Sequence, residues 1–176
     1  MLLRSLVGLI EEIEGSIFMN DSNLKNIDIT HFRELARHLV TNNRTLQGTI
    51  LENITHNNTD ISKEFVQLLV EKLQLKDFVK AQDKGLQTVI YSEGRQLPYT
   101  VNKKIMIARA LASKPKLLVL KDPTEDFLDE EESEVIDFIT DPKMPWAVVI
   151  VSRSDKWKSK CNRFFFMDNG VMSIKE

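Results

Sequence analysis

This sequence has a single cysteine, no long apolar run and no excess of basic residues. The single cysteine, Cys161, cannot form a disulfide within the chain, which suits a reducing compartment. No run of about 18 or more apolar residues occurs, so we expect no membrane-spanning helix. The 24 basic residues are outnumbered by 26 acidic ones, and the net charge of -2 argues against a nucleic-acid-binding protein.

Glycine and metal-ligating residues are also sparse. The six glycines nowhere form G-x-x-x-x-G-K-[ST], the loop with which many proteins hold nucleotide phosphates. The three histidines lack paired metal spacing, and the acidic run at residues 129–134 has neither EF-hand spacing nor a histidine or cysteine beside it. We therefore expect no metal site, and we interpret the acidic run as the solvated start of a helix.

The 176 residues, of which 42% are hydrophobic, are enough for one globular domain with a sizeable core. Apolar residues at helical spacing predict helices, and dense apolar runs predict strands. The expected helices cover residues 2–10, 60–75, 101–111 and 130–139, and a turn is expected at 20–23. The expected strands cover residues 16–19, 38–41, 116–120, 146–151, 163–167 and 171–174. Alternation of strands and helices predicts an α/β fold, a largely parallel sheet with helices on both faces.

Three of the expected strands have a further property in common. Residues 116–120, 146–151 and 163–167 are dense apolar runs, typical of strands that are buried in a parallel sheet. The Asp-Asn-Gly sequence at 168–170 predicts a turn from the third of them into the last strand.

Two long stretches resemble a known family. Residues 105–112 (IMIARALA), 115–120 (PKLLVL) and 122–124 (DPT) are similar, in order and without gaps, to the segment of ABC transporter ATPases between the signature helix and Walker B. Residues 48–54 (GTILENI) resemble the segment after the Q-loop, most of all in exporters, including those that secrete peptides or toxins. The similarity extends to three more segments, residues 2–9, 148–152 and 167–170, and so covers essentially the whole chain.

This resemblance implies a P-loop NTPase-like fold, a layered sheet with helices on both faces plus a helical subdomain. It assigns residues 1–54 and 103–176 to the core with the sheet, and residues 55–102 to the helical subdomain. The start of the chain matches the helix that follows Walker A, so we expect the Walker A strand to be lacking. In the family that strand lies beside the strand before the H-loop. Residues 146–151 are then expected to form an unpaired edge, with low stability or self-association as the consequence.

Further implications of the resemblance concern ligands and partners. The family binds ATP with Mg²⁺, and its domains pair with a second nucleotide-binding domain and with a membrane domain of the transporter. The implied location is cytoplasmic, peripheral at the inner face of the membrane. No nucleic-acid partner is implied.

The Walker B position is altered in this chain. The family ends this strand with Asp-Glu, where Asp holds the Mg²⁺ shell and Glu polarises the attacking water. Here the pair is Lys121 and Asp122. A lysine has only donors and cannot ligate Mg²⁺. Asp122 is the candidate catalytic residue, one methylene shorter than Glu, whereas Lys121 either contacts phosphate or simply ends the strand facing solvent.

The signature position is altered as well. Where the family has LSGGQ, which contacts the γ-phosphate on the partner subunit, this chain has Leu97, Pro98, Tyr99, Thr100 and Val101. Both glycines are gone, which obstructs close approach of the backbone to phosphate. Thr100 keeps a hydroxyl one place before the expected helix, where it either caps that helix or contacts phosphate.

Two more nucleotide positions differ from the family. The Q-loop glutamine falls on Asn42, or on Thr41 after a one-residue slip, and the switch histidine falls on Arg153. Arginine cannot accept a hydrogen bond, so Arg153 cannot relay a proton as histidine does. It either holds a phosphate electrostatically or is simply exposed.

Two functions follow from these substitutions. The first is an ATP-binding subunit or domain of an ABC-type exporter that couples nucleotide binding to transport with weak or no hydrolysis of its own. The alternative is a non-catalytic pseudo-ATPase, a docking or regulatory module that binds a transporter membrane domain or a partner nucleotide-binding domain.

Overall fold

A three-stranded parallel sheet forms the middle of the molecule in the computed structural model, which describes all residues except 12–13, 41–43, 92–93 and 175–176. The strands are β3 (Ala36–Leu39), β6 (Leu117–Lys121) and β7 (Ala147–Val151), in the order β3-β6-β7. Leu118, Val119 and Leu120 of the central strand are fully buried. The α/β fold and its parallel sheet are thereby confirmed.

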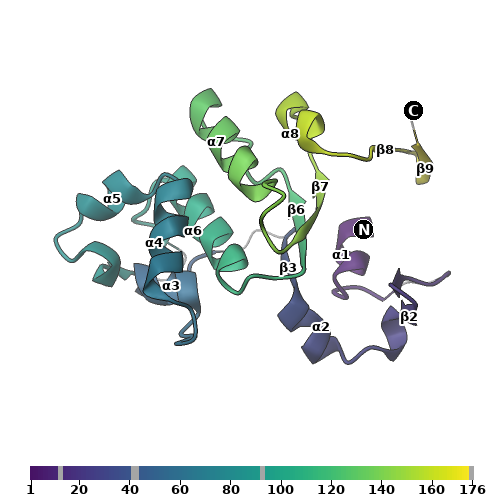
Figure 1. Cartoon of the computed structure of the whole chain (residues 1–176), viewed down its shortest axis with the longest axis horizontal. Helices are drawn as coiled ribbons and strands as arrows, with labels where there is room; N and C mark the ends of the chain where they lie inside the picture. The colour runs from purple at the N-terminus through teal and green to yellow at the C-terminus, as the bar shows by residue number, and fades with distance from the viewer. Residues whose placement is uncertain (12–13, 41–43, 92–93, 175–176) are drawn as a thin grey trace.

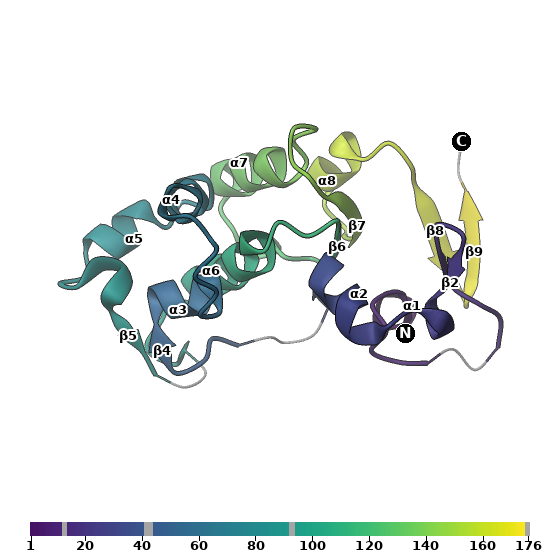
Figure 2. The same cartoon turned by 60° about the horizontal axis from the view of Figure 1, so that its bottom comes forward.

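Helices lie to either side of this sheet in both views (Figure 1, Figure 2). On one side are α3 (Ile50–Thr55), α4 (Lys63–Lys72), α5 (Lys76–Lys80), α6 (Tyr99–Ala112) and α7 (Asp129–Ile139). On the other are α1 (Leu2–Leu6) and α2 (Ile29–Leu35), and α8 (Asp155–Lys160) follows β7. Within the described residues, no helix is both long enough and apolar enough to cross a bilayer.

Short elements make up the remainder. The two 3₁₀ helices are η1 (Leu24–Asn26) and η2 (Gly85–Gln87). The two-stranded antiparallel sheets are β1 (Phe18–Met19) with β2 (Ser22–Asn23), β4 (Gly48–Thr49) with β5 (Val89–Ile90), and β8 (Phe165–Asp168) with β9 (Val171–Ile174). The turns expected at residues 20–23 and 168–170 fall at the first and last of these hairpins.

One large core joins the sheet to its helices. It contains fully buried side chains from α3, α4, α6, β6 and α7, among them Ile54, Leu69, Leu111 and Leu120. Removing such side chains from water contributes roughly 1.5–3 kcal/mol each. A smaller cluster of Leu24, Phe32 and Ala36 fixes the N-terminal segment against β3.

Local sequence explains where several helices begin. Thr49 and Glu52 form a reciprocal capping box at the start of α3. Ser62 caps α4 by accepting from the backbone N–H of Phe65. The acidic run at 129–134 does start α7, where its carboxylates favour the positive end of the helix dipole.

Two expectations about element ends were wrong. The first helix, expected over residues 2–10, stops at Leu6 because Gly8 takes φ +66°, outside the helical region. Thr100 does not cap α6. That helix begins at Tyr99, and the carbonyl of Pro98 accepts its first backbone hydrogen bond, from Asn102 at 3.0 Å.

The expected burial of two strands was also wrong. β7 has a neighbour on one side only within the described chain, and Val149 and Val151 are 38% and 48% exposed. This confirms the expected unpaired edge. β8 is exposed along its whole length. Among the described strands it pairs with β9 alone, and this hairpin stands away from the parallel sheet in both views (Figure 1, Figure 2).

Candidate functional site

The ends of β3 and β6 and the start of α6 enclose a pocket of about 660 Å³. In parallel sheets, ligands bind outside the carboxyl ends of the strands, which is where this pocket lies. Lys121, Asp122, Leu97 and Tyr99 all line it. The structure therefore brings together residues of the altered Walker B and signature positions, which are separated by about twenty residues in the sequence.

Lys121 is the last residue of β6 and its side chain is exposed. It makes no hydrogen bond or ion pair within the described part of the chain. Leu118, Val119 and Leu120 of the same strand are buried in the core, and this fixes Lys121 at the edge of the pocket. This position agrees with both interpretations of Lys121, because the side chain is exposed to solvent and also lines the pocket, where it can contact a phosphate.

Asp122 adopts a strained backbone, with φ +39°, directly after the strand. Its N–H donates to the carbonyl of Val151 at 3.0 Å, and its Oδ1 accepts from the N–H of Arg153 at 3.3 Å. These two bonds tie the end of β6 to the end of β7. One oxygen of the Asp122 carboxylate is therefore held by the backbone N–H of the loop that follows β7.

Arg153 is exposed, which agrees with the interpretation of this residue as a solvent-facing side chain. Its guanidinium forms an ion pair with Glu125 at 3.1 Å, and the side chain is 89% exposed. An ion pair this exposed contributes about 1 kcal/mol or less. Arg153 does not line the pocket, although it holds the two carboxylates that do, Asp122 and Glu125.

The five residues of the signature position have different surroundings. Leu97 and Tyr99 face the pocket, and the ammonium of Lys103 lies 4.9 Å from the centre of the Tyr99 ring. Val101 packs against the large core. Pro98 and Thr100 do not line the pocket. No side chain caps the start of α6, which leaves first-turn N–H groups without a side-chain acceptor.

Gly94 closes the wall of the pocket beside these residues. It takes φ +62°, and a side chain there would meet Thr45 Oγ1 at 2.3 Å and Asn102 Oδ1 at 3.2 Å. Only glycine fits such a close approach without rearrangement. The Q-loop candidates Asn42 and Thr41 lie outside the described residues.

A half-buried arginine holds the segment that carries Arg44, another residue of the pocket lining. Arg109 of α6 donates to the carbonyl of Asn53 at 2.7 Å and to the carbonyl of Arg44 at 3.4 Å. Burial lowers the pKa of Arg109 below its usual value. Asn53 in turn accepts from the N–H of Leu46 at 2.8 Å, so the segment that carries Arg44 is anchored to α3 and α6.

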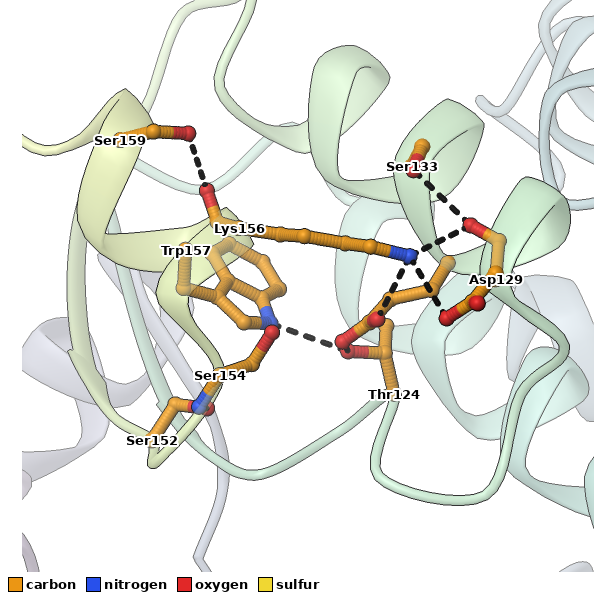
Figure 3. Close-up of polar contacts among 9 residues, drawn as sticks. Thr124, Asp129, Ser133, Ser152, Ser154, Lys156, Trp157 and Ser159 are labelled. Carbon is orange, nitrogen blue, oxygen red and sulfur yellow. Dashed lines mark hydrogen bonds and ion pairs between the residues drawn. The ribbon is translucent and has the colours of Figure 1, made fainter.

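Sequence reasoning missed a polar network that holds the loop after Asp122 (Figure 3). Trp157 of α8, which is 1% exposed, donates from its indole nitrogen to Thr124 Oγ1 at 2.9 Å. Thr124 donates to Glu132 of α7 at 3.2 Å. The only signal in the sequence was the match of Thr124 to the family segment, since its partners lie far along the chain.

Lys156 closes the same network. Its ammonium lies 3.1 Å from both Asp129 Oδ1 and Glu132 Oε2 (Figure 3). Partial burial acts to lower the pKa of Lys156, but the hydrogen bonds to Glu132 and Asp129 outweigh it and raise that pKa. The loop between β6 and α7 is therefore held by two residues of α8.

Mg²⁺ does not fit the residues of this pocket. The cation prefers carboxylate oxygens, yet Glu125 pairs with the guanidinium of Arg153, Asp122 Oδ1 accepts from the backbone N–H of Arg153, and the neighbouring Lys121 offers only donors. No group of three or more His, Cys, Asp or Glu side chains converges anywhere in the described residues. The cationic lining suits a phosphate group better than a metal ion.

Comparisons with known proteins agree with this geometry. Residues 1–125 match the family model described as ABC transporter. The chain is 25% identical over 172 residues to a probable ABC transporter ATP-binding/permease protein of Haemophilus influenzae, covering 98% of this chain and 31% of that protein. It is 33% identical over 129 residues to the ABC multidrug transporter atrD of Emericella nidulans, covering 72% of this chain and 10% of the other.

A solved structure shows the same fold. The structure of a bacterial Atm1-family ABC exporter with ATP bound superposes with a TM-score of 0.87 at 17% identity, over 96% of this chain and 30% of that one. This chain thus spans about a third of the length of the exporter and of the Haemophilus protein. Fold, motif order and family match agree, and the chain belongs to the ABC transporter family, with the fold of its ATP-binding domain.

Proposed function

We propose that this chain is the ATP-binding domain of an ABC-type exporter and couples nucleotide binding to transport with weak or no hydrolysis of its own. The observation that carries the proposal is the end of β6. There Lys121 enters the pocket and Asp122 accepts from the N–H of Arg153. A nucleotide meets the positive charge of Lys121 here, and the carboxylate available to polarise water is that of Asp122, which is one methylene shorter than glutamate and already accepts a hydrogen bond through Oδ1.

The partners in this proposal are a transporter membrane domain and a second nucleotide-binding domain, either identical or different. The location is the cytoplasmic face of the membrane, where the chain is peripheral. Support comes from relatives whose names combine ATP-binding and permease functions, one of them the glutathione/L-cysteine transport protein CydC of Escherichia coli, 24% identical over 169 residues. ATP is the nucleotide we expect.

A docking or regulatory module without nucleotide is the second candidate. The β8–β9 hairpin favours it, because Phe165, Met167, Val171 and Ile174 are all more than half exposed. Exposed apolar groups gathered on one hairpin are typical of a surface that binds another protein.

Calorimetric titration of ATP into the purified chain separates the two candidates. We expect binding tighter than about 1 mM, which corresponds to roughly −4 kcal/mol. The titration is run both with Mg²⁺ and with a chelator, so that either form of the nucleotide is detected. No heat in either titration, together with binding of a detergent-solubilised exporter membrane domain, would instead establish the docking module.

A further inference from the structure

The β8–β9 hairpin presents an apolar face to solvent. Successive side chains of a strand point to opposite faces of a sheet, so Phe165 and Met167 share one face of β8. The register of the hairpin sets Ile174 opposite Phe165 and Met172 opposite Met167. All four side chains are more than half exposed. These four residues, the apolar face of the hairpin, therefore place two thioether groups together in solvent.

Met167 and Met172 are direct cross-strand partners. The Cβ atoms of residues directly opposite each other in an antiparallel pair are about 4.5–5.5 Å apart. Methionine is unbranched and has three rotatable side-chain bonds, so its sulfur can move over the surface on which it lies. A small reagent that reaches one of these thioethers can therefore reach the other.

The methionines of this chain differ widely in their access to solvent. Met167 and Met172 are each 54% exposed, whereas Met106 of α6 is 6% exposed. Met1 is 85% exposed, but it precedes α1 and does not belong to the hairpin. An oxidant in solution must touch the sulfur that it oxidises, so the hairpin pair is expected to react early and Met106 late.

We infer that Met167 and Met172 form a peroxide-sensitive oxidation site, which converts the apolar face of the hairpin into a polar one. A lone pair of each thioether sulfur attacks one oxygen of hydrogen peroxide and the O–O bond breaks. The hydroxide that leaves takes up the proton of the transferred oxygen and departs as water. Each sulfur is thereby oxidised by two electrons to a sulfoxide, and one peroxide is reduced.

Oxidation changes the character of the whole face. A sulfoxide is polar, and enzymes that reduce methionine sulfoxide can reverse its formation. Two sulfoxide oxygens beside Phe165 and Ile174 would have to give up their hydrogen bonds to water whenever an apolar group covered the face. The oxidised hairpin is therefore a poorer surface for apolar ligands. This inference rests on the hairpin alone and holds whether or not the chain binds ATP.

The test treats the purified chain with hydrogen peroxide and follows each methionine by peptide mass spectrometry. Met167 and Met172 are expected to form sulfoxide at least about 10-fold faster than Met106. Binding of the apolar dye anilinonaphthalene sulfonate, measured by fluorescence, is expected to fall by roughly 2-fold or more after oxidation. Treatment with methionine sulfoxide reductases and a thiol reductant is expected to restore dye binding.

The matched control replaces both methionines, Met167→Leu together with Met172→Leu. Leucine is apolar and of similar volume but has no sulfur to oxidise. Dye binding to this double variant is expected to be unchanged by peroxide. The variant retains Met1 and Cys161, so it also controls for oxidation elsewhere in the chain.

A second double variant, Met167→Gln with Met172→Gln, makes the face polar without peroxide. It is expected to bind the dye as weakly as the oxidised chain does, and circular dichroism checks that the fold is retained. Oxidation of Met167 and Met172 as slow as that of Met106 would overturn the inference. So would undiminished dye binding after both sulfoxides have formed, or an equal loss of dye binding in the leucine variant.

Discussion

At the scale of single residues, the chemistry of the site depends on what each carboxylate already contacts. Asp122, which the resemblance predicts at the position of the catalytic glutamate, accepts through Oδ1 from the N–H of Arg153 and has a strained backbone. Arg153, predicted at the position of the switch histidine, pairs with Glu125. The two predicted positions are therefore in direct contact in the structure.

Thr124 offers a direct test of how the neighbouring loop is held. Thr124→Val keeps the shape of the side chain but removes the hydroxyl that joins Trp157 to Glu132. We expect a loss of about 1–3 kcal/mol in the free energy of unfolding, because a buried indole N–H is left without an acceptor. Urea denaturation of the unmodified chain and of the variant measures this difference in the free energy of unfolding.

The control for this variant is Ser159→Ala, at an exposed hydroxyl of α8 that donates only to the carbonyl of Lys156. Its expected effect is within about 0.5 kcal/mol. If Thr124→Val were as stable as Ser159→Ala, the network would be incidental to the position of the loop.

At the scale of elements, the edge of the sheet is the feature that requires an explanation. β7 carries only Ala, Val and Ile, and within the described residues it has β6 as its sole neighbour. Natural edge strands are commonly protected by lysine, proline or a bulge, and β7 itself has none of these. The unpaired backbone N–H and C=O groups of β7 can form hydrogen bonds with a strand of another chain.

We therefore expect the isolated chain to self-associate through β7 or to be thermally unstable. Val149→Lys places a charge on the exposed face of this strand and is expected to shift the chain toward monomer. Sedimentation velocity across a range of concentrations measures the change, with Val89→Lys in β5, at a similarly exposed valine, as the control. A thermostable monomer in the unmodified chain would rule out this account of the edge.

Periodicity located most of the large elements from sequence. α4, α6, β6 and α7 were expected within a few residues of their ends, since their apolar spacing reflects burial against a single core. β8 was misjudged because an apolar run shows that a strand is suited to burial and not what covers it. The start of α6 was misjudged because Pro98 begins the helix with its carbonyl.

The candidate site was predictable only in part. Lys121, Asp122 and the signature position could be found because each lies in a contiguous motif. The contacts of Arg153 with Asp122 and of Trp157 with Thr124 join residues about thirty positions apart, and only the packing of β7 beside β6 brings them together. The Q-loop position, Asn42, lies outside the described residues.

At the scale of the whole molecule, the cationic pocket lies where the sheet meets the helices on one side of it. The division into a core of residues 1–54 and 103–176 and a helical subdomain of residues 55–102 stays a prediction. It places the two halves of the pocket on different subdomains, with Arg95 and Tyr99 on one and Lys121 on the other.

The rate of phosphate release from ATP, at a concentration that calorimetry shows to be saturating, tests the central claim most directly. With Mg²⁺ present, the account predicts turnover of about 0.1 s⁻¹ or less, roughly 100-fold below a typical enzyme, because Asp122 is one methylene shorter than glutamate and its Oδ1 is held by the N–H of Arg153. Turnover near 10 s⁻¹ that is lost in Asp122→Asn would contradict it, since Asp122 would then be acting as a catalytic residue.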